Sequence, residues 1–346
     1  MLVLVHSKNY SFIGLIAFTL CVPFFFATSI FESFIEKKVT PSDVMMKYIE
    51  IPTMDKSKYE LITGSFEVRD NGDIIKGNSD QNLWEDALKD WKLSLAEKPA
   101  NRQKILIYIH GMWAHRPWIQ NAVMTKYYDS VFNQENNPYG LVISLTWQSG
   151  LSYWENKENA LNTGHFFGQI LEQLRLWDHA GMDILAHSMG NRVLQGIYES
   201  LDEKECYPRI FNTLYMHAAD LEVNIFQPGE PMDSITYIAD SIWIYIHQND
   251  RTLGMSRSIN KNDRLGLNPS PDATIINDRI RMIDVSLIDD NEGIGPNLSN
   301  HRYFYSSATV RRDMMLQMTG ACNDDRYPSS KKGYFILQPY LPHKVP

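Results

Sequence analysis

Short apolar runs alternate with amphipathic stretches along the middle of this chain, and that alternation restricts the fold more than any other feature of the sequence. From Lys104 onward, the runs have the length of strands and the stretches between them have the apolar spacing of helices. Strict alternation requires crossover connections, which produce a mostly parallel sheet with helices on both faces. We therefore predict an α/β fold. Its buried strands are expected at Ile105–Ile109, Leu141–Thr146, Met182–Ala186, Phe211–Met216 and Ser241–His247, and a further apolar run follows at Arg279–Val285.

The same patterns predict the helices and the limits of the domain. Helices are expected at Asn82–Leu95, Trp118–Phe132, Asn159–Trp177 and Met189–Leu201. Before them, Tyr59–Val68 is predicted to form a first strand or hairpin, and the mixed, polar stretch Glu32–Asp55 to be a linker. A chain of 346 residues with 44% apolar composition can bury one large core. We assign residues 38–346 to a single domain and residues 1–37 to a separate N-terminal segment.

The pentapeptide Ala186–Gly190 lies where the third predicted strand gives way to a helix. A small residue, any residue, serine, any residue and glycine at such a junction is the pattern of a nucleophile elbow, a sharp turn that lifts a serine hydroxyl above the end of the sheet. Ala186 replaces the usual first glycine, and its methyl group is still small enough for the backbone to pass. Ser188 is therefore predicted to be a nucleophile.

Acidic residues and a histidine follow the later strands, at the edge of the sheet where chemistry gathers in such folds. Asp220 follows the fourth predicted strand, Asp250 follows the fifth, and His301 ends a long loop after the next apolar run. Serine, acid and histidine in this order match the triad of α/β hydrolases. A serine hydroxyl needs a neutral imidazole to accept its proton, and the imidazole needs a carboxylate to fix its tautomer. We predict a triad of Ser188, Asp250 and His301, with Asp220 as the alternative acid.

Other residues near the predicted site are assigned supporting roles. Hydrolysis needs donors for the negative oxygen of a tetrahedral intermediate, and we predict the backbone N–H groups of Met189 and Met112 for this purpose. His110 and His187 are expected to be structural rather than catalytic. Five aromatic residues are candidates for an apolar acyl pocket or for the core: Trp113, Trp118, Trp147, Tyr153 and Trp154.

The N-terminal stretch Phe12–Ile30 is almost uncharged and follows a short basic segment. About 20 apolar residues can span a bilayer, but Ala27–Ser29 also supplies the small residues of a signal-peptide cleavage site. Either interpretation, a retained anchor or a cleaved signal, places the rest of the chain outside the cytosol. After export, Cys206 and Cys322 could form a disulfide or remain as two thiols.

Charge and composition restrict the partners. The formal net charge of −8, without a basic run, argues against nucleic acid as a partner. The sequence contains no metal-binding motif and no Gly-rich phosphate loop followed by a helix, so we expect neither a metal nor another cofactor. The expected partner is a small-molecule or lipid-like ester, with membrane association through Phe12–Ile30.

With these residues assembled, the chain from about 104 to 313 resembles a bacterial family of α/β hydrolases of uncharacterised function with an esterase-like or lipase-like core. The resemblance implies a serine hydrolase fold and mechanism, but no particular substrate. This sequence departs from the family pattern at Gln148 and at Ala219, where the family usually has proline. The motifs that carry the resemblance are Ile107–Gly111, Thr146–Gly150, Ala186–Leu194, Asn249–Asp250, Arg264–Gly266, Ile283–Val285 and His301–Phe304.

The function predicted from the sequence is hydrolysis of a carboxylic ester through an acyl-enzyme. Two alternatives remain open: a binding or scaffold protein that keeps the hydrolase fold without turnover, and an acyltransferase or thioesterase that uses the same triad. Two segments that follow strand ends, Gln148–Asn159 and Leu221–Asp240, are candidates for a lid.

Overall fold

The computed structural model describes residues 44–51, 61–71, 73–80, 83–202, 209–267, 278–290 and 299–340. Two of the features predicted from the sequence, the stretch Phe12–Ile30 and Cys206, the predicted disulfide partner of Cys322, lie outside these residues. Cys322 itself is exposed. Among the described residues, no helix is long and apolar enough to cross a membrane.

Eleven strands of the described chain form one continuous sheet, with the order β10-β11-β9-β8-β7-β6-β4-β5-β1-β2-β3. The strands from β11 through β1 are parallel to their neighbours, whereas β2, β3 and β10 are paired antiparallel at the two edges. The central strands are buried on both faces, which is why they appear in the sequence as continuous apolar runs. The strands are β1 Met45–Ile51, β2 Ile62–Val68, β3 Ile74–Ser79, β4 Lys104–Ile109, β5 Tyr139–Trp147, β6 Met182–His187, β7 Phe211–His217, β8 Ala239–Ile246, β9 Ile280–Asp284, β10 Arg326–Pro328 and β11 Tyr334–Leu337.

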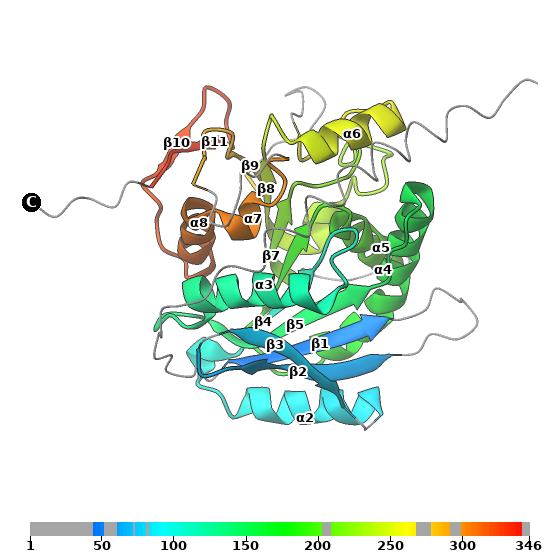
Figure 1. Ribbon diagram of the computed structural model, residues 1–346, viewed down its shortest axis with the longest axis vertical. Helices are drawn as coiled ribbons and strands as arrows, with labels where there is room; N and C mark the ends of the chain where they lie inside the picture. The colour runs from blue at the N-terminus through cyan, green and yellow to red at the C-terminus, as the bar shows by residue number, and fades with distance from the viewer. Residues whose placement is uncertain are drawn as a thin grey trace, which may run out of the picture.

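Helices cover both faces of this sheet (Figure 1). One core lies between the sheet and α2, α4 and α5, and the other lies between the sheet and α3, α7 and α8. A mostly parallel sheet with helices on both faces is the α/β class predicted from the sequence. The helices are α2 Trp84–Ala96, α3 Pro117–Tyr127, α4 Tyr153–Arg175, α5 Gly190–Asp202, α6 Arg251–Asn260, α7 Tyr303–Ser306 and α8 Ala308–Met318, with short 3-10 turns at Ala100–Arg102 and Ile235–Tyr237.

The prediction that Glu32–Asp55 is a linker was wrong for β1, which lies inside the sheet between β2 and β5. Two charged residues interrupt the apolar pattern of this strand, and both have partners on the neighbouring hairpin. Lys47 Nζ donates to Ser65 Oγ at 2.8 Å, and Glu50 forms a 2.6 Å ion pair with Lys76. Because both side chains have partners on the β2–β3 hairpin, a strand with two charges is stable inside the sheet.

Two helices differ from their predicted limits. The helix expected at Trp118–Phe132 is α3, which ends at Tyr127 and continues as a π-helical turn over Tyr128–Phe132. The helix expected to begin at Asn159 is α4, which begins at Tyr153 because Ser152 caps it and accepts a hydrogen bond from the Glu155 backbone N–H.

The helices α4 and α5 pack very closely, which fixes the helix that follows the predicted nucleophile. A Cβ added to Gly164 would lie 2.1 Å from the Val193 carbonyl oxygen, and one added to Gly196 would lie 2.1 Å from the Leu161 carbonyl oxygen. Only glycine permits this backbone contact.

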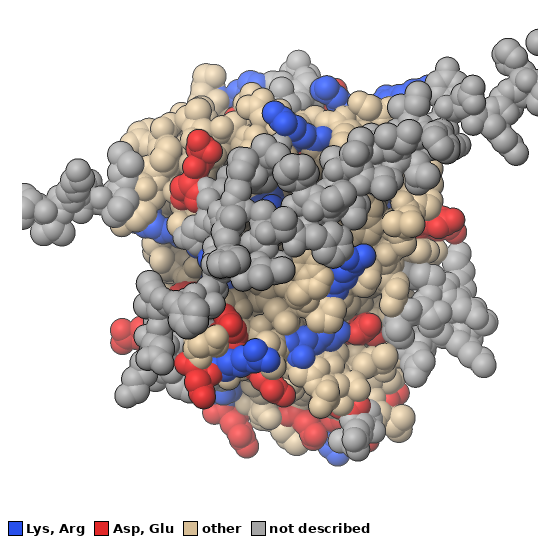
Figure 2. Space-filling model, viewed as in Figure 1, with Lys and Arg blue, Asp and Glu red and all other residues tan. Residues whose placement is uncertain are grey.

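On the face shown in Figure 2, acidic and basic side chains of the described residues are interspersed.

Candidate active site

Ser188 lies in a sharp turn between β6, which ends at His187, and α5, which begins at Gly190. Its φ of 55° is in the left-handed region, which a residue with a side chain adopts only when its surroundings hold it there. One such restraint is the hydrogen bond from the Ser188 backbone N–H to the His217 carbonyl oxygen, at 2.9 Å. The geometry is that of a nucleophile elbow.

The loop after β4 presses against this elbow. A Cβ on Gly111 would lie 2.9 Å from Ser188 Cβ, and a Cβ on Gly190 would lie 2.6 Å from the His110 carbonyl oxygen. Neither contact leaves room for a side chain, so both positions require glycine. Met112 follows Gly111 in the loop, and Met189 follows Ser188 in the elbow. The structure therefore places both predicted oxyanion donors in segments that border Ser188.

Three side chains form a continuous hydrogen-bonded chain at the carboxyl edge of the sheet. His301 Nε2 lies 2.9 Å from Ser188 Oγ, and His301 Nδ1 lies 2.6 Å from Asp250 Oδ2. All three residues are at least nine-tenths buried, and Asp250 is almost wholly inaccessible. With Nδ1–H donating to the carboxylate, Nε2 is free to accept the serine proton.

Asp250 uses its two oxygens differently. It is the N-cap residue of α6, and its Oδ1 accepts a hydrogen bond from the Leu253 backbone N–H at 3.0 Å. Its Oδ2 faces His301. This position at the start of α6 also places the carboxylate at the positive end of the helix dipole. Helix capping and alignment of the histidine are thus combined in one side chain.

His301 is held in place by a second histidine. His187 Nε2 lies 3.0 Å from the His301 carbonyl oxygen, so its Nε2 carries the proton and donates. The His187 ring also stacks on Phe304, with centroids 4.2 Å apart. Burial lowers the pKa of His187 well below its usual value, which keeps the ring neutral. His187 is packed, as expected from the sequence, and it supports the backbone at His301.

His110 is likewise buried, with a pKa lowered by burial to about 3. Its Nε2 accepts a hydrogen bond from the Trp147 backbone N–H at 3.1 Å, which requires the neutral ring. The His110 imidazole and the Trp147 indole also stack, with ring centroids 5.6 Å apart. His110 therefore has a structural position inside the loop rather than contact with the triad atoms.

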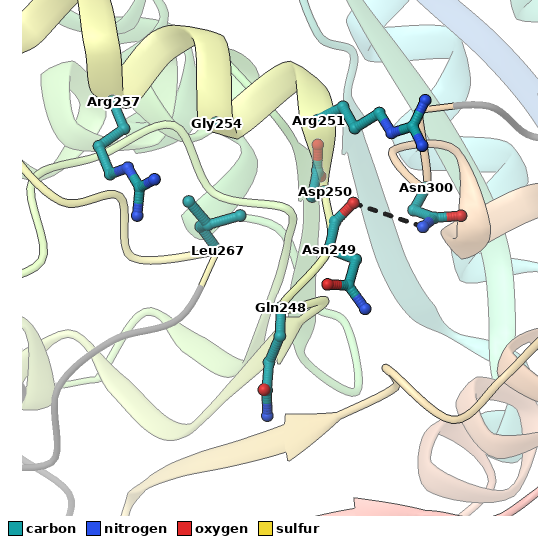
Figure 3. A pocket seen from close by; sticks show the side chains of 8 residues that line it. All are labelled: Gln248, Asn249, Asp250, Arg251, Gly254, Arg257, Leu267 and Asn300. Carbon is teal, nitrogen blue, oxygen red and sulfur yellow. Dashed lines mark hydrogen bonds between the residues drawn. The ribbon is translucent and has the colours of Figure 1, made fainter.

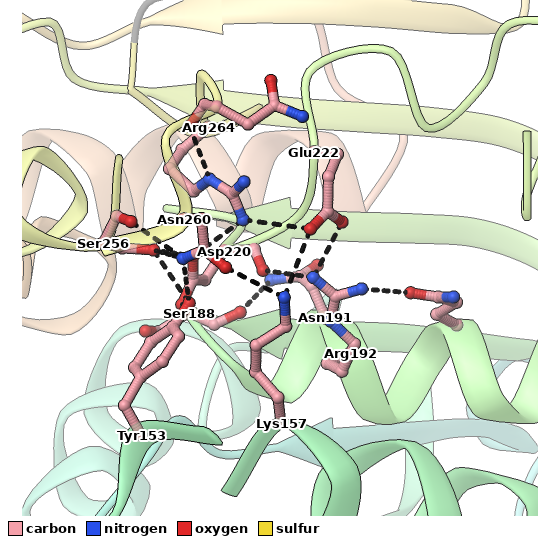
Figure 4. Close-up of polar contacts among 12 residues, drawn as sticks. Tyr153, Lys157, Ser188, Asn191, Arg192, Asp220, Glu222, Ser256, Asn260 and Arg264 are labelled. Carbon is pink, nitrogen blue, oxygen red and sulfur yellow. Dashed lines mark hydrogen bonds and ion pairs between the residues drawn. The ribbon is translucent and has the colours of Figure 1, made fainter. Parts of the chain in front are cut away.

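Asp220 does not contact His301 in the structure but belongs to a separate polar cluster. Its Oδ1 accepts a 2.5 Å hydrogen bond from Ser256 Oγ, and its Oδ2 accepts a 2.9 Å bond from the Tyr153 hydroxyl (Figure 4). Arg264 lies 3.6 Å from the same carboxylate. The structure thus brings Asp250 to the histidine and leaves Asp220 bound to other partners.

This cluster contains residues that sequence analysis did not assign to the site. Arg192 and Arg264 both pair with Glu222, at 2.8 Å and 3.4 Å. Because two arginines surround it, the pKa of Glu222 is lowered to about 2, although burial alone would raise it. Arg192 follows the elbow and Arg264 opens a motif of the family resemblance, but nothing in the sequence showed that they share one acid.

The five aromatic candidates for an acyl pocket separate into core and surface. Trp147 is fully buried against His110 and belongs to the core. Tyr153 directs its hydroxyl to Asp220. Trp118 and Trp154 are exposed, and the Trp113 indole N–H donates to the Gly150 carbonyl oxygen at 2.7 Å.

A hollow of about 520 Å³ lies beside the acid rather than at the nucleophile (Figure 3). Ser188 is not among the residues that line it. Two arginines, Arg251 and Arg257, give this hollow a basic character. Its lining consists of Gln248, Asn249, Asp250, Arg251, Gly254, Arg257, Leu267 and Asn300.

The two predicted lid segments have defined structure. Most of Gln148–Asn159 forms the first turns of α4. In Leu221–Asp240, several apolar side chains are buried in the core beside α4 and α5, including Ile225, Phe226 and Met232. Among the described residues, no cluster of histidine, cysteine, aspartate or glutamate side chains is suited to hold a metal ion.

A parallel sheet covered on both faces, with an elbow serine, a histidine and an acid at the carboxyl ends of its strands, is the arrangement of an α/β hydrolase. The family model described as an alpha/beta hydrolase of unknown function (DUF900) matches residues 86–318, and the chain belongs to that family. The match confirms the family resemblance noted in the sequence. A comparison with curated proteins gave no match.

Proposed function

We propose that this protein is a serine hydrolase that cleaves carboxylic esters through an acyl-enzyme. The observation that carries the proposal is the unbroken chain from Ser188 Oγ to His301 and from His301 to Asp250, with distances of 2.9 Å and 2.6 Å. Membership in an α/β-hydrolase family supports a hydrolase-type fold. The particular triad and the ester substrate are our inference from the geometry.

In the first half-reaction, Ser188 Oγ attacks the ester carbonyl carbon while its proton passes to His301 Nε2. Asp250 holds the imidazole in the Nδ1–H tautomer and stabilises the imidazolium. The backbone N–H groups of Met189 and Met112 donate to the negative oxygen of the tetrahedral intermediate. When this intermediate collapses, the carbon–oxygen bond to the leaving group breaks and His301 returns the proton to the alcohol.

The second half-reaction repeats the proton transfers with water. His301 removes a proton from water as the water oxygen attacks the acyl carbon. Collapse of the second tetrahedral intermediate releases the carboxylic acid, and the proton on His301 returns to Ser188. A chain of neutral and charged groups that meets these demands needs no metal, so the proposal includes no cofactor.

The experiment that tests this proposal is covalent labelling of the full-length chain with a fluorophosphonate probe. We expect labelling of the wild type and its loss in Ser188→Ala and in His301→Ala. The matched control is Ser258→Ala, because Ser258 lies on the exposed side of α6 and bonds only within that helix among the described residues. Labelling of Ser258→Ala at the wild-type rate shows that the loss is specific to the elbow serine.

A folded wild type that takes up no probe would remove the hydrolase proposal and favour the binding-protein alternative. If labelling succeeds, p-nitrophenyl esters of increasing acyl length and a matched thioester define the substrate class.

We further propose that Phe12–Ile30 directs export or anchors the chain. Fractionation of cells expressing the full chain, with and without residues 1–37, tests this, and a soluble cytosolic full-length chain would contradict it.

A further inference from the structure

Two segments that the triad does not explain, the loop His110–Trp113 and the strand end Trp147–Gly150, are joined by side-chain hydrogen bonds. At the base of the loop, Trp147 donates its backbone N–H to His110 Nε2 at 3.1 Å and its indole N–H to the His110 carbonyl oxygen at 2.8 Å. At the tip, the Trp113 backbone N–H donates to Ser149 Oγ at 2.6 Å. The Trp113 indole N–H donates to the Gly150 carbonyl oxygen at 2.7 Å.

The far side of this connection is anchored in α4. Gly150 donates its N–H to Asn156 Oδ1 at 2.7 Å, and Asn156 Nδ2 donates back to the Gly150 carbonyl oxygen at 2.9 Å. Asn156 is fully buried. A buried amide with both groups satisfied fixes the loop between β5 and α4. The segment we predicted as a lid is thus a rigid support at this point.

Ser149 is also fixed on both sides of its hydroxyl. Its oxygen accepts from Trp113, and it lies 3.3 Å from His115 Nδ1. Burial lowers the pKa of His115, so its ring is neutral and Nδ1 accepts a hydrogen bond from the Ser149 hydroxyl. The side chain of Ser149 is nearly inaccessible to solvent. Its orientation is therefore determined by the protein rather than by water.

The residue that Ser149 holds is in a strained conformation. Trp113 has a φ of 65°, and a bulky residue in the left-handed region costs on the order of 1–3 kcal/mol. Such a backbone conformation persists only where the surroundings enforce it. The two hydrogen bonds from Trp113 to Ser149 and Gly150 are the restraint that the structure shows. The predicted donor in this loop, the Met112 N–H, belongs to the peptide group between Gly111 and Met112, directly before the restrained turn at Trp113.

We infer that Ser149 and Trp113 are positioning residues, which hold the loop after β4 so that its backbone N–H donors face the oxyanion that forms at Ser188. Gly111 lies so near the elbow that an added Cβ would be 2.9 Å from Ser188 Cβ, so a shift of this loop would press on the elbow. The inference rests on the proposed esterase function, and it assigns a role to the motif Trp147–Gly150. Neither residue touches the reacting atoms.

The expected effect is on the transition state rather than on substrate binding. Removal of a whole oxyanion donor typically lowers kcat by about 10²–10³-fold. Ser149→Ala displaces a donor instead of deleting it, so we expect about a ten-fold loss of kcat with little change in KM. A trifluoromethyl ketone, which forms a tetrahedral adduct with the serine, should bind about ten-fold more weakly to the variant. A residue that acts on folding alone would not produce this split.

The test uses the full-length chain and p-nitrophenyl butyrate. Ser149→Ala and Trp113→Phe should each lower kcat, and Ser149→Thr, which keeps the hydroxyl, should recover most of the activity. Ser258→Ala and Trp243→Phe are the matched controls, because the Trp243 indole N–H has no hydrogen-bond partner among the described residues. A folded Ser149→Ala whose kcat and ketone affinity stay within two-fold of the wild type would overturn the inference.

Hydrogen exchange separates this inference from the proposed function. The peptide covering residues 110–116 should exchange at least ten-fold faster in Ser149→Ala, because the Trp113 amide loses its acceptor. Unchanged exchange would overturn the connection whether or not the protein hydrolyses esters. A wild type that neither labels nor hydrolyses an ester, but shows the change in exchange, would instead disprove the esterase proposal and with it the role at the oxyanion.

Discussion

Replacing Asp250 with asparagine separates the two functions of this side chain. Asparagine is as good an N-cap as aspartate, and its amide oxygen can keep the bond to the Leu253 backbone N–H. The amide NH₂ group then faces His301 Nδ1, where the carboxylate oxygen lies at 2.6 Å in the wild type. Because an NH₂ group only donates, Nδ1 must become an acceptor and the ring proton moves to Nε2.

That tautomer blocks the proposed reaction, since Nε2 is the atom that must accept the Ser188 proton. A misplaced tautomer of this kind lowers kcat by about 10⁴-fold, which corresponds to roughly 5 kcal/mol of transition-state stabilisation. If the amide instead rotates to accept from His301, its NH₂ group faces the Leu253 N–H and α6 loses its cap, at a cost of about 1 kcal/mol. The first arrangement preserves stability and loses activity, whereas the second does the reverse.

The assay combines p-nitrophenyl butyrate hydrolysis with urea unfolding of the same preparations. We expect Asp250→Asn to lower kcat by about 10⁴-fold while its free energy of unfolding changes by less than about 1 kcal/mol. Asp250→Ala should lose both activity and the cap. If Asp250→Asn retained more than a tenth of the wild-type kcat with an unchanged free energy of unfolding, Asp250 would not be the orienting acid.

Three further results are expected. Asp220→Asn should lower the free energy of unfolding by about 1–3 kcal/mol, because the Asp220 carboxylate faces Arg264. Its kcat should stay far above that of Asp250→Asn. An equal loss of kcat in the two variants would restore Asp220 as a candidate acid. Gly111→Ala should lower kcat by about 10²-fold, because the new Cβ would lie 2.9 Å from Ser188 Cβ. Its matched control is Gly254→Ala in α6, where a Cβ meets no heavy atom within 4 Å, and which should stabilise the protein by about 0.5–1 kcal/mol in urea unfolding. Finally, burial lowers the pKa of His217 to about 3, so the contribution of the neutral ring to stability is complete above the unfolded pKa of about 6.5 and is lost as the pH falls toward 3. His217→Phe should therefore reduce the loss of unfolding free energy between pH 6.5 and pH 5 by about 2 kcal/mol. An unchanged dependence of the unfolding free energy on pH would contradict the buried neutral ring.

The strands that carry the site could be predicted because they are buried on both faces. In β4, β5 and β6 most side chains are apolar and every residue but Lys104 is buried, so sequence and structure agree to within a few residues. The elbow could be predicted for the same reason, since a fully buried strand with the apolar run Ile184–Ala186 ends directly before Ser188. The strand β1 lacks this signal, because it includes Lys47 and Glu50, whose partners on the β2–β3 hairpin are distant in the sequence.

The choice between the two candidate acids could not be made from the sequence alone. Asp220 and Asp250 both follow central parallel strands, and both are buried. What separates them is the direction of each side chain, which depends on contacts distant in the sequence. Asp220 is bound by Tyr153 and Ser256, whereas Asp250 begins α6 and faces the loop that carries His301. The histidine loop follows a different strand, so its approach to Asp250 is visible only in three dimensions.

Strained backbone conformations are concentrated around the proposed catalytic residues. The contacts that hold these conformations join distant segments, so the sequence could not identify the residues that support the site. Six described residues other than glycine have positive φ, and four of them border the site: Trp113, Ser188, Ala218 and Asn300. Ser188 and Ala218 directly follow strands, Trp113 lies in the loop after β4, and Asn300 directly precedes His301. Each such conformation costs on the order of 1–3 kcal/mol. Glycine would remove that cost at every one of these positions, yet the chain has a side chain there. At Ser188 the side chain is the proposed nucleophile, and at Trp113 the indole N–H is part of the restraint on the loop. At Ala218, the backbone N–H donates to two acceptors, the Tyr245 carbonyl oxygen at 3.2 Å and the Tyr303 hydroxyl oxygen at 2.8 Å, and this ties the helix after His301 to the end of β7. The strain is therefore balanced by contacts between segments far apart in the sequence, and those same contacts bring the serine, the acid and the histidine together.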